Sequence, residues 1–319
     1  SPAGLAIDGT NLYVADTGNY RVRKIVISTG AVTTIAGSGS SGFVDGNATS
    51  AKFAAIYGLT TDGTNVYVAG YTNHRIRKIV ISTGVVTTLA GSGSRNFGDG
   101  TGTSAHFNYP MGLTNAGDYL YVTDRHNHRI RKINKSTKVV TTLAGSGSAG
   151  FTNATGTSAK FYYPWGIQND GKNLYVGDGH NHRIRKIVIS TGAVTTLAGS
   201  GSSSSTDGSG TAASFSYPYE VGIDENNIYV ADYNNNRIRK IALRGTATAD
   251  VKLHNLDDDT DAVVSIASSD TGEGTVSPAT LTFTENNWNT AQTVTVAGVN
   301  DTDRDRHQAY KISLAAADQ

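Results

Sequence analysis

Two histidine pairs are the first residues of this chain whose type and spacing suggest chemistry. His126 and His180 each stand two residues before a second histidine, at positions 128 and 182. Imidazoles at this spacing could hold a divalent metal, but a metal site normally also needs an inward carboxylate or a third imidazole, and no unique one is present. We expect these histidines to be polar residues of turns, with metal binding as the alternative.

Aspartates recur at one place in a repeated pattern. Asp16, Asp124, Asp178 and Asp232 each end an expected strand just before a polar turn, whereas Gly70 holds the matching place. A carboxylate there can accept hydrogen bonds from turn amides or pair with the arginine that follows. Because a catalytic residue more often occurs once, we expect these aspartates to be structural.

Sequence patterns of familiar catalytic sites are absent. The chain has no G-x-S-x-G, no H-E-x-x-H, and no glycine-rich phosphate loop that ends in lysine. It also has no cysteine, which excludes thiol nucleophiles, disulfides and cysteine-bound zinc. We therefore expect a protein that is not an enzyme.

The elements that position these residues follow a strict repeat. The motif NHRIRKI at residues 127–133 has near-copies whose first arginines, at positions 21, 75, 129, 183 and 237, are 54 residues apart. The first repeat holds four short apolar or alternating segments, at residues 4–8, 11–16, 21–27 and 31–37. We expect these segments to be strands and residues 38–53 to be a glycine-rich linker. One such blade cannot bury both faces alone, so we expect the blades to stack around a closed axis.

The repeated elements resemble NHL repeats. They comprise Gly-Leu or Gly-Ile, Leu-Tyr-Val-Ala-Asp, Asn-His-Arg-Ile-Arg-Lys-Ile and Phe-x-x-Pro, the last at residues 107–110, 161–164 and 215–218. The resemblance covers residues 1 to about 243 and implies an all-β, five-bladed NHL-type β-propeller whose short first strands line the axis. That family commonly closes with six blades. The fifth repeat stops near Leu243, so its fourth strand would come from residues 246–254, from another chain, or be missing.

Places where the repeats differ are the best indicators of binding, because equal scaffolding needs would give equal residues. The residue after the proline of each repeat varies, and the next residue is glycine except at Glu220. These positions would lie at the mouth of the axis, where they either contact a ligand or fill gaps against the linker. The predicted binding residues at this axial mouth are Tyr57, Met111, Trp165, Tyr219, Glu220, His126 and His180.

The period is lost after about residue 243, and residues 244–319 are predicted to form a small β-sandwich-like domain that is incomplete, because its opening hairpin is missing. Residues 274–283 and 287–296 are similar to Calx-β-like, immunoglobulin-like modules of bacterial surface proteins. In such modules acidic linkers bind Ca²⁺, a cation that takes several carboxylate oxygens. The resemblance implies a possible calcium site, with a solvated linker as the alternative, at Asp257, Asp258, Asp259 and Asp261. We expect no other cofactor.

The amino-acid composition limits the classes of partner that the chain can bind. The 27 basic and 26 acidic residues give a net charge of +1, so no global field attracts nucleic acid or a lipid surface. Fifteen of the basic residues belong to the repeated triplet, which we expect to pack between blades with its charged groups in water; nucleic-acid binding, as in some NHL relatives, is the alternative. No apolar run is long enough to insert into a membrane. Ser1-Pro2 does not begin a signal peptide, and we expect an exported chain without its leader.

Three functions fit these observations. The first is a secreted, cell-surface structural protein that associates with copies of itself, as a homo-oligomer or filament, by adding strands at incomplete β edges. The second is an adhesin or carrier that binds a surface glycan, peptide or protein at the axial mouth. The third, implied by the NHL resemblance, is a lyase or metal-dependent hydrolase.

Overall fold

The structure is a computed structural model that describes residues 2–224, 226–243, 246–251, 262–268, 274–284, 287, 290–298 and 312–316. It divides into two compact units. The first comprises residues 1–223 and 229–241, and the second comprises residues 224–228 and 242–319. Each unit is described by itself.

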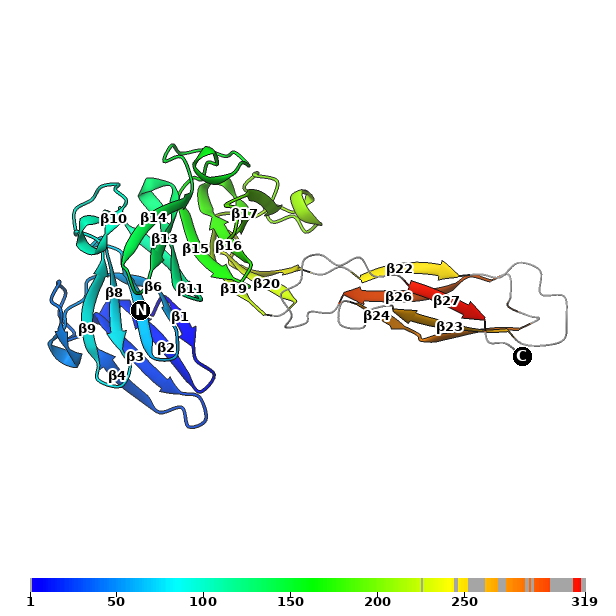
Figure 1. Ribbon diagram of the computed structural model, residues 1–319, viewed down its shortest axis with the longest axis horizontal. Helices are drawn as coiled ribbons and strands as arrows, with labels where there is room; N and C mark the ends of the chain where they lie inside the picture. Colours follow the sequence, from blue (N-terminus) through cyan, green and yellow to red (C-terminus); the bar gives the residue numbers. More distant parts are fainter. Residues whose placement is uncertain are drawn as a thin grey trace. The chain divides into compact units, whose positions relative to one another are not determined.

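The first unit is a five-bladed β-propeller, drawn from blue to yellow in Figure 1. Blades 1 and 2 contain β1 (Leu5–Ile7), β2 (Asn11–Asp16), η1 (Thr17–Asn19), β3 (Arg21–Val26), β4 (Val32–Ala36), β5 (Gly46–Asn47), η2 (Ala48–Ser50), β6 (Ile56–Thr61), β7 (Asn65–Gly70), β8 (Arg75–Val80) and β9 (Val85–Ala90). Blade 3 contains β10 (Gly100–Thr101), η3 (Gly102–Ser104), β11 (Pro110–Ala116), β12 (Tyr119–Asp124), η4 (Arg125–Asn127), β13 (Arg129–Asn134) and β14 (Val139–Ala144).

Blades 4 and 5 repeat this order. They contain η5 (Gly156–Ser158), β15 (Pro164–Asn169), β16 (Asn173–Asp178), η6 (Gly179–Asn181), β17 (Arg183–Val188), β18 (Val194–Ala198), η7 (Gly210–Ala212), β19 (Pro218–Ile223), β20 (Asn227–Asp232), η8 (Tyr233–Asn235) and β21 (Arg237–Ala242). The four strands expected in the first repeat are confirmed to within one residue at each end. Within blades 1 to 4 neighbouring strands are antiparallel.

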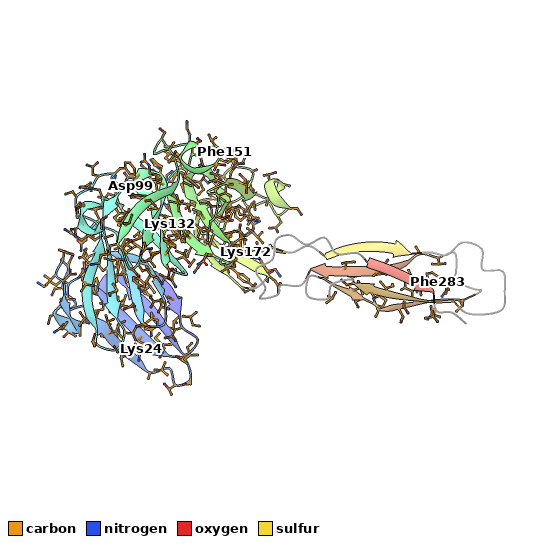
Figure 2. The ribbon with its side chains drawn as sticks, viewed as in Figure 1. Lys24, Asp99, Lys132, Phe151, Lys172 and Phe283 are labelled. Carbon is orange, nitrogen blue, oxygen red and sulfur yellow. The ribbon has the colours of Figure 1, made fainter. Side chains whose placement is uncertain are left out.

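The linkers do more than connect blades, because the expected glycine-rich linker at residues 38–53 also contains the short strand β5. In this linker β5 pairs with β9 and so becomes a fifth strand at the outer edge of blade 2. Asp45 of the same linker accepts a hydrogen bond from the Thr88 backbone N–H at 2.9 Å. The linker therefore packs against the outer edge of the blade that follows it. In Figure 2 the linker residues Asp99 and Phe151 lie at the periphery of the propeller.

A buried arginine fastens the linker to blade 3. Arg131 is fully buried and forms 2.7 Å ion pairs with Asp124 of its own blade and Asp99 of the linker. Its guanidinium also donates to the carbonyl oxygens of Gly98 and His106. Arg185 and Arg77 are buried at the same place in blades 4 and 2. The second arginine of the triplet therefore packs against its own blade and the linker before it, and its charged group is buried rather than in water, where the prediction placed it.

Neighbouring blades bury one face against the other in the same way each time. Between blades 2 and 3, Tyr67 and Ile76 contribute from one side and Leu113, Leu120 and Ile133 from the other. Equivalent residues form the cores on either side of this interface. The hydrophobic effect of these repeated interfaces is the main force that holds the blades together.

The outward faces of the two end blades lack this cover among the described residues. Leu5 in β1 is 58% exposed, whereas its counterpart Leu113 is 4% exposed. Ile238 in β21 is 72% exposed, whereas its counterpart Ile184 is fully buried. The expected closure of the ring is thus not seen, because the five blades leave the faces of blades 1 and 5 uncovered.

The second unit has two three-stranded antiparallel sheets, β22-β26-β24 and β25-β23-β27. The strands are β22 (Thr246–Val251), β23 (Ala262–Ser268), β24 (Gly274–Ser277), β25 (Thr280–Phe283), β26 (Gln292–Gly298) and β27 (Ile312–Ala316). A small core joins them, with Phe283 and Val264 from one sheet and Val294 from the other. Because β22 pairs with β26, it does not serve as the fourth strand of blade 5. The resemblance to a Calx-β-like module stays a prediction.

The buried ion pair predicts a large loss of stability on mutation. Removing Asp124 leaves the buried Arg131 guanidinium with the partly exposed Asp99 as its remaining carboxylate and also removes the acceptor of Asn127 and of the Asn108 backbone N–H. Asp124→Ala should therefore lower the free energy of unfolding by about 3 kcal/mol. Asp16→Ala is the matched control, because Asp16 and Arg23 are partly exposed and 3.8 Å apart, and it should cost below about 1 kcal/mol. Urea denaturation measures both values. Equal losses in the two variants would contradict this account of the arginine.

Candidate functional site

The candidate site lies at the end of the propeller where the inner strands begin. In blades 3 and 4 the first residue of the inner strand, Pro110 or Pro164, pairs with the aspartate that ends the second strand. The 3-10 turns that follow these aspartates therefore lie at the same end as the residues after each proline. The variable positions of the repeats meet here, and we call this end the mouth.

One continuous network of aromatic rings covers the mouth across blades 2 to 5. Its rings approach one another with centroid separations of 4.5–6.3 Å, in tilted or edge-to-face arrangements. The members are Tyr57, Tyr71, His74, Tyr109, His126, His128, Tyr162, Tyr163, Trp165, His180, His182, Tyr217, Tyr219 and Tyr233. The fourteen rings thus form one connected cluster at this end of the propeller, and most of them are half-buried.

Most of the predicted mouth residues come together in this network. Trp165 contacts Tyr219 at 4.6 Å, and Tyr57 contacts Tyr71 at 5.0 Å. His126 and His180 are also members. Met111 occupies the equivalent place in blade 3 and is buried, and it adds no ring to the network.

Among the described residues, Trp165 is a mouth residue that has an unpaired hydrogen-bond donor, which suits it to bind a ligand. Its indole is 8% exposed, and its Nε1 atom is buried without a hydrogen-bond partner in the part of the chain that the structure describes. The backbone below it is fixed, because the Thr123 hydroxyl donates to the Trp165 carbonyl at 2.5 Å. An unpaired buried donor costs free energy that a ligand acceptor would recover.

Arg125 places a positive charge within the rings. Its guanidinium lies 4.7 Å from the ring of Tyr163 and 5.3 Å from that of Trp165, both within cation-π range. It donates hydrogen bonds to the Tyr71 hydroxyl at 3.2 Å and to Nε2 of His126 at 2.7 Å. No carboxylate of the described residues forms an ion pair with it. The guanidinium is thus free to meet an acceptor on a ligand.

The histidines of the mouth are neutral. Burial, then the charge of Arg125, lowers the pKa of His126 to about 4, which agrees with its Nε2 accepting a hydrogen bond from Arg125. His128 and His182 end 3-10 turns, and His74 ends the corresponding turn of blade 2. Each accepts a backbone N–H at Nδ1, from Tyr163, Tyr217 and Tyr109 respectively. Burial lowers the pKa of all three. The prediction that these residues serve the turns is confirmed for His128 and His182.

An axial channel of about 250 Å³ runs below the mouth. All five inner strands contribute to its wall, which is largely apolar. The residues that line it include Leu5, Leu59, Leu113, Ile167, Gln168 and Glu220. Glu220 is therefore placed in the axis as predicted, below the rings rather than among them.

The metal predictions have different outcomes. Within the described ranges no group of three histidine, aspartate or glutamate side chains is arranged to hold a metal ion. The predicted calcium residues Asp257, Asp258, Asp259 and Asp261 lie outside the described residues.

The recurring aspartates are structural, as expected: Asp124 accepts hydrogen bonds from Asn127 and Arg131 and from the backbone N–H of Asn108. No helix in the described part of the chain has the length and apolar character needed to cross a membrane.

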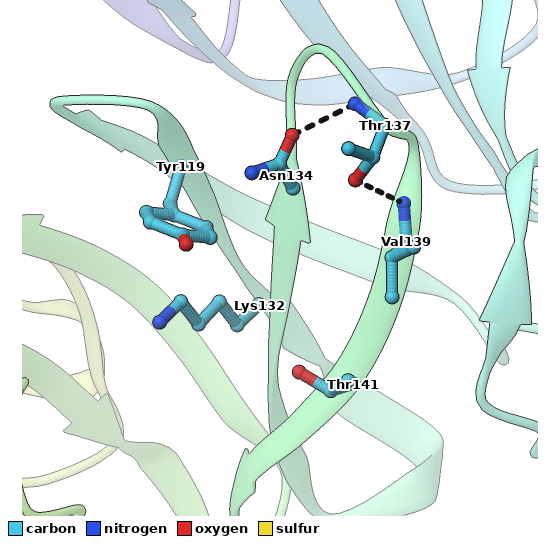
Figure 3. A pocket seen from close by; sticks show the side chains of 6 residues that line it. All are labelled: Tyr119, Lys132, Asn134, Thr137, Val139 and Thr141. Carbon is cyan, nitrogen blue, oxygen red and sulfur yellow. Dashed lines mark hydrogen bonds between the residues drawn. The ribbon is translucent and has the colours of Figure 1, made fainter.

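A second hollow lies on the outer side of blade 3, between β12, β13 and β14 (Figure 3). The ammonium of Lys132 sits 3.8 Å from the ring centroid of Tyr119. The repeats carry asparagine where blade 3 has Tyr119, so this pair is a local feature of one blade. It lacks the converging rings of the mouth and serves below as a control surface.

Several mouth residues escaped the sequence analysis. Tyr109, Tyr163 and Tyr217 precede the prolines, and Tyr71 and Arg125 follow the second strands. A signal was present, because position 125 and its counterparts 71, 179 and 233 differ between repeats in the same way as the positions that were chosen. Only the register of the inner strands shows that the two sets of positions meet at one end.

Comparison with known proteins supports an NHL-type propeller. The chain is 31% identical over 263 residues to protein SUPPRESSOR OF QUENCHING 1, chloroplastic, of Arabidopsis thaliana, which covers 76% of this chain and 25% of that protein. It is also 31% identical over 282 residues to NHL repeat-containing protein 2 of Gallus gallus and of Homo sapiens, covering 76% of this chain and 39% of each. The chain thus matches a quarter to two fifths of these relatives. No protein-family model matches it.

Solved structures share the fold. An auxiliary nutrient binding protein from Bacteroides ovatus superposes with a TM-score of 0.59 at 18% identity, over 76% of this chain and 59% of that one. The counterpart from Bacteroides thetaiotaomicron gives 0.57 at 18% identity, over 75% and 58%. A chain of a nidogen/laminin complex gives 0.55 at 17% identity, over 76% of both. At these identities the similarity establishes the β-propeller fold alone.

The neutral histidines predict a pH-dependent stability. Their pKa is lower in the folded chain than the value of about 6.5 expected when unfolded, so protonation favours unfolding. Their contribution is complete above pH 6.5 and is lost as the pH falls towards the lowered pKa values. The melting temperature should therefore fall between pH 7 and pH 5.

A matched variant isolates one of these histidines. Asn236 occupies the same left-handed turn position in blade 5, so His128→Asn should fold and should reduce the slope of melting temperature against pH. Thermal scans across the range measure the slope. An unchanged slope in His128→Asn would contradict the role given to this imidazole.

Proposed function

We propose that this protein is a non-enzymatic binding module whose ligand site is the aromatic mouth of the propeller. One observation carries the proposal: the indole N–H of Trp165 is buried among the connected rings without a hydrogen-bond partner in the described residues, and the Arg125 guanidinium beside it has no carboxylate partner there. Flat rings stack on the apolar faces of sugars and on peptide side chains, and the polar groups between them fix orientation.

The comparisons support the coarser part of this proposal. Relatives with NHL repeats and propellers described as nutrient binding proteins favour a binding or scaffold role. The finer part, a secreted or cell-surface adhesin or carrier that takes a glycan or a peptide, rests on the chemistry of the mouth. The large area of ring surface suits either ligand.

A second candidate function is self-association into a surface assembly or filament. It is favoured by the outer edge of β21, which no strand pairs within the described residues of blade 5. Such an edge offers unpaired backbone N–H and C=O groups to a strand of another copy. The exposed side chain of Ile238 would add apolar contact next to that edge.

Ligand binding should depend on Trp165. We expect Trp165→Ala to weaken binding to the best-bound member of glycan and peptide arrays by about 30-fold or more, because a central aromatic anchor is lost. Tyr119→Ala, which alters the outer hollow, should leave affinity unchanged. Isothermal titration measures both, with melting temperature as a check on folding. Full affinity in a folded Trp165→Ala protein would rule out the mouth as the site.

Self-association should depend on the edge of β21. We expect light scattering to show species larger than a monomer that grow with concentration, and Ile238→Lys to shift the protein towards monomer, because a charge at an edge opposes strand addition. Ile27→Lys is the control, since Ile27 is also exposed and lies in blade 1 beyond the end of β3. A monodisperse monomer at high concentration would contradict this second candidate.

A further inference from the structure

Glu220 breaks a rule that the other four blades obey. Its place in the inner strand is glycine in blades 1 to 4, and in blade 3 the reason is clear: a Cβ on Gly112 would lie 2.5 Å from the Trp165 carbonyl of the next blade. No described blade follows blade 5, so β19 has room for a side chain at this position.

The carboxyl of Glu220 lies back against blade 4. Its Oε1 atom is 2.6 Å from the point that a Cβ on Gly166 would occupy, so the missing side chain at residue 166 makes the space that it fills. Glu220 comes two residues after Pro218, inside the channel and below the rings of Trp165 and Tyr219.

This carboxylate has no cationic partner among the described residues. It accepts one hydrogen bond, from its neighbour's backbone N–H on Val221, at 3.4 Å. Glu220 is exposed, so its side chain is open to water at the channel. The protein groups around it nevertheless raise the pKa of Glu220 to about 7 by partial desolvation. Every buried arginine of the blades, in contrast, has an aspartate partner.

The side chains that line the channel beside the carboxylate are mostly apolar, and glycine backbone lies between them. Leu5, Leu59, Leu113 and Ile167 line the channel, with Gln168 as a polar neighbour. A lone carboxylate cannot complete the several oxygen ligands that Ca²⁺ takes. A primary ammonium on an aliphatic stem suits the site better, because its methylenes can lie on the leucines while its charge meets the carboxylate.

We propose that the channel receives the lysine side chain of a peptide ligand and that Glu220 binds its ammonium group. The proposal rests on the mouth being the ligand site and names the ligand chemistry. Arg125 in η4 belongs to the rim, where it repels a cation held close to the rings. A four-carbon stem carries the ammonium past that charge, which favours lysine over an amino group fixed on a sugar ring.

The test compares a charged probe with an uncharged one. The probes are acetyl-Gly-Lys-Gly-amide and the same peptide with norleucine, whose aliphatic stem lacks the ammonium. Binding is followed by NMR through the indole N–H signal of Trp165, assigned with Trp165→Phe. The variant Glu220→Gly copies the residue of the four other blades and should fold, and Glu220→Gln retains the shape of the side chain without its charge.

We expect the lysine probe to bind at least about tenfold more tightly than the norleucine probe, as for a charge-assisted hydrogen bond, and the ratio to fall to about one in both variants. A ratio of one in the unmodified chain, or an unchanged ratio in Glu220→Gly, overturns the proposal. So does a preference for glucosamine oligomers over their N-acetylated forms that depends on Glu220 without any response to the lysine probe.

Failure of the broader proposal looks different. If array ligands bind through Trp165 but ignore the charge at residue 220, the mouth remains the ligand site and the lysine assignment is wrong. If the lysine probe binds through Glu220 and Trp165→Ala leaves every ligand unaffected, the channel acts without the mouth, and the proposed function is wrong.

Discussion

The buried arginine of each middle blade is the interaction on which the structure depends. In blade 3, Arg131 joins the second strand through Asp124, the linker through Asp99, and two linker carbonyls at the same time. A buried charge is costly unless it is paired and hydrogen-bonded, and both terminal nitrogens of this guanidinium have partners, so the arginine fixes one path for the linker over the blade. That path delivers Phe107 to the interblade core and then leads to Pro110 at the mouth. The arrangement of the rings follows from it.

Most residues that form the blades are the same or similar in every repeat, and several positions that differ between repeats lie in the candidate site. The inner-strand glycines allow neighbouring backbones to approach closely, which draws the residues before and after each proline into one rim. Tyrosine, histidine, tryptophan and arginine then fill that rim from four blades. At blade 5 the close approach is not required, and Glu220 takes the place of glycine. The same geometry thus explains both the ring surface and the single carboxylate below it.

Much of this could be predicted from the sequence, because a constant 54-residue period fixes equivalent positions without coordinates. This period predicted the four strands of the first four repeats, the structural role of Asp124, and the position of Trp165 next to the proline of blade 4. It did not give the fifth strand made by Gly46–Asn47, since two residues carry no period. Nor did it give Arg125, because a residue of a turn is linked to an inner strand only by strand register. The exposure of Leu5 and Ile238 could not be predicted, because the repeat pattern does not show whether blades 1 and 5 pack against each other.

Hydrogen exchange of the whole chain, with and without the tightest ligand from the arrays, tests the central claim most directly. The account predicts slower exchange of backbone amides in the turns and inner-strand starts of blades 2 to 5, at residues 56–58, 71–74, 108–112, 125–128, 162–166, 179–182 and 217–221. Slower exchange confined to the edge of β21 or to the second unit, with the mouth unchanged, would contradict it.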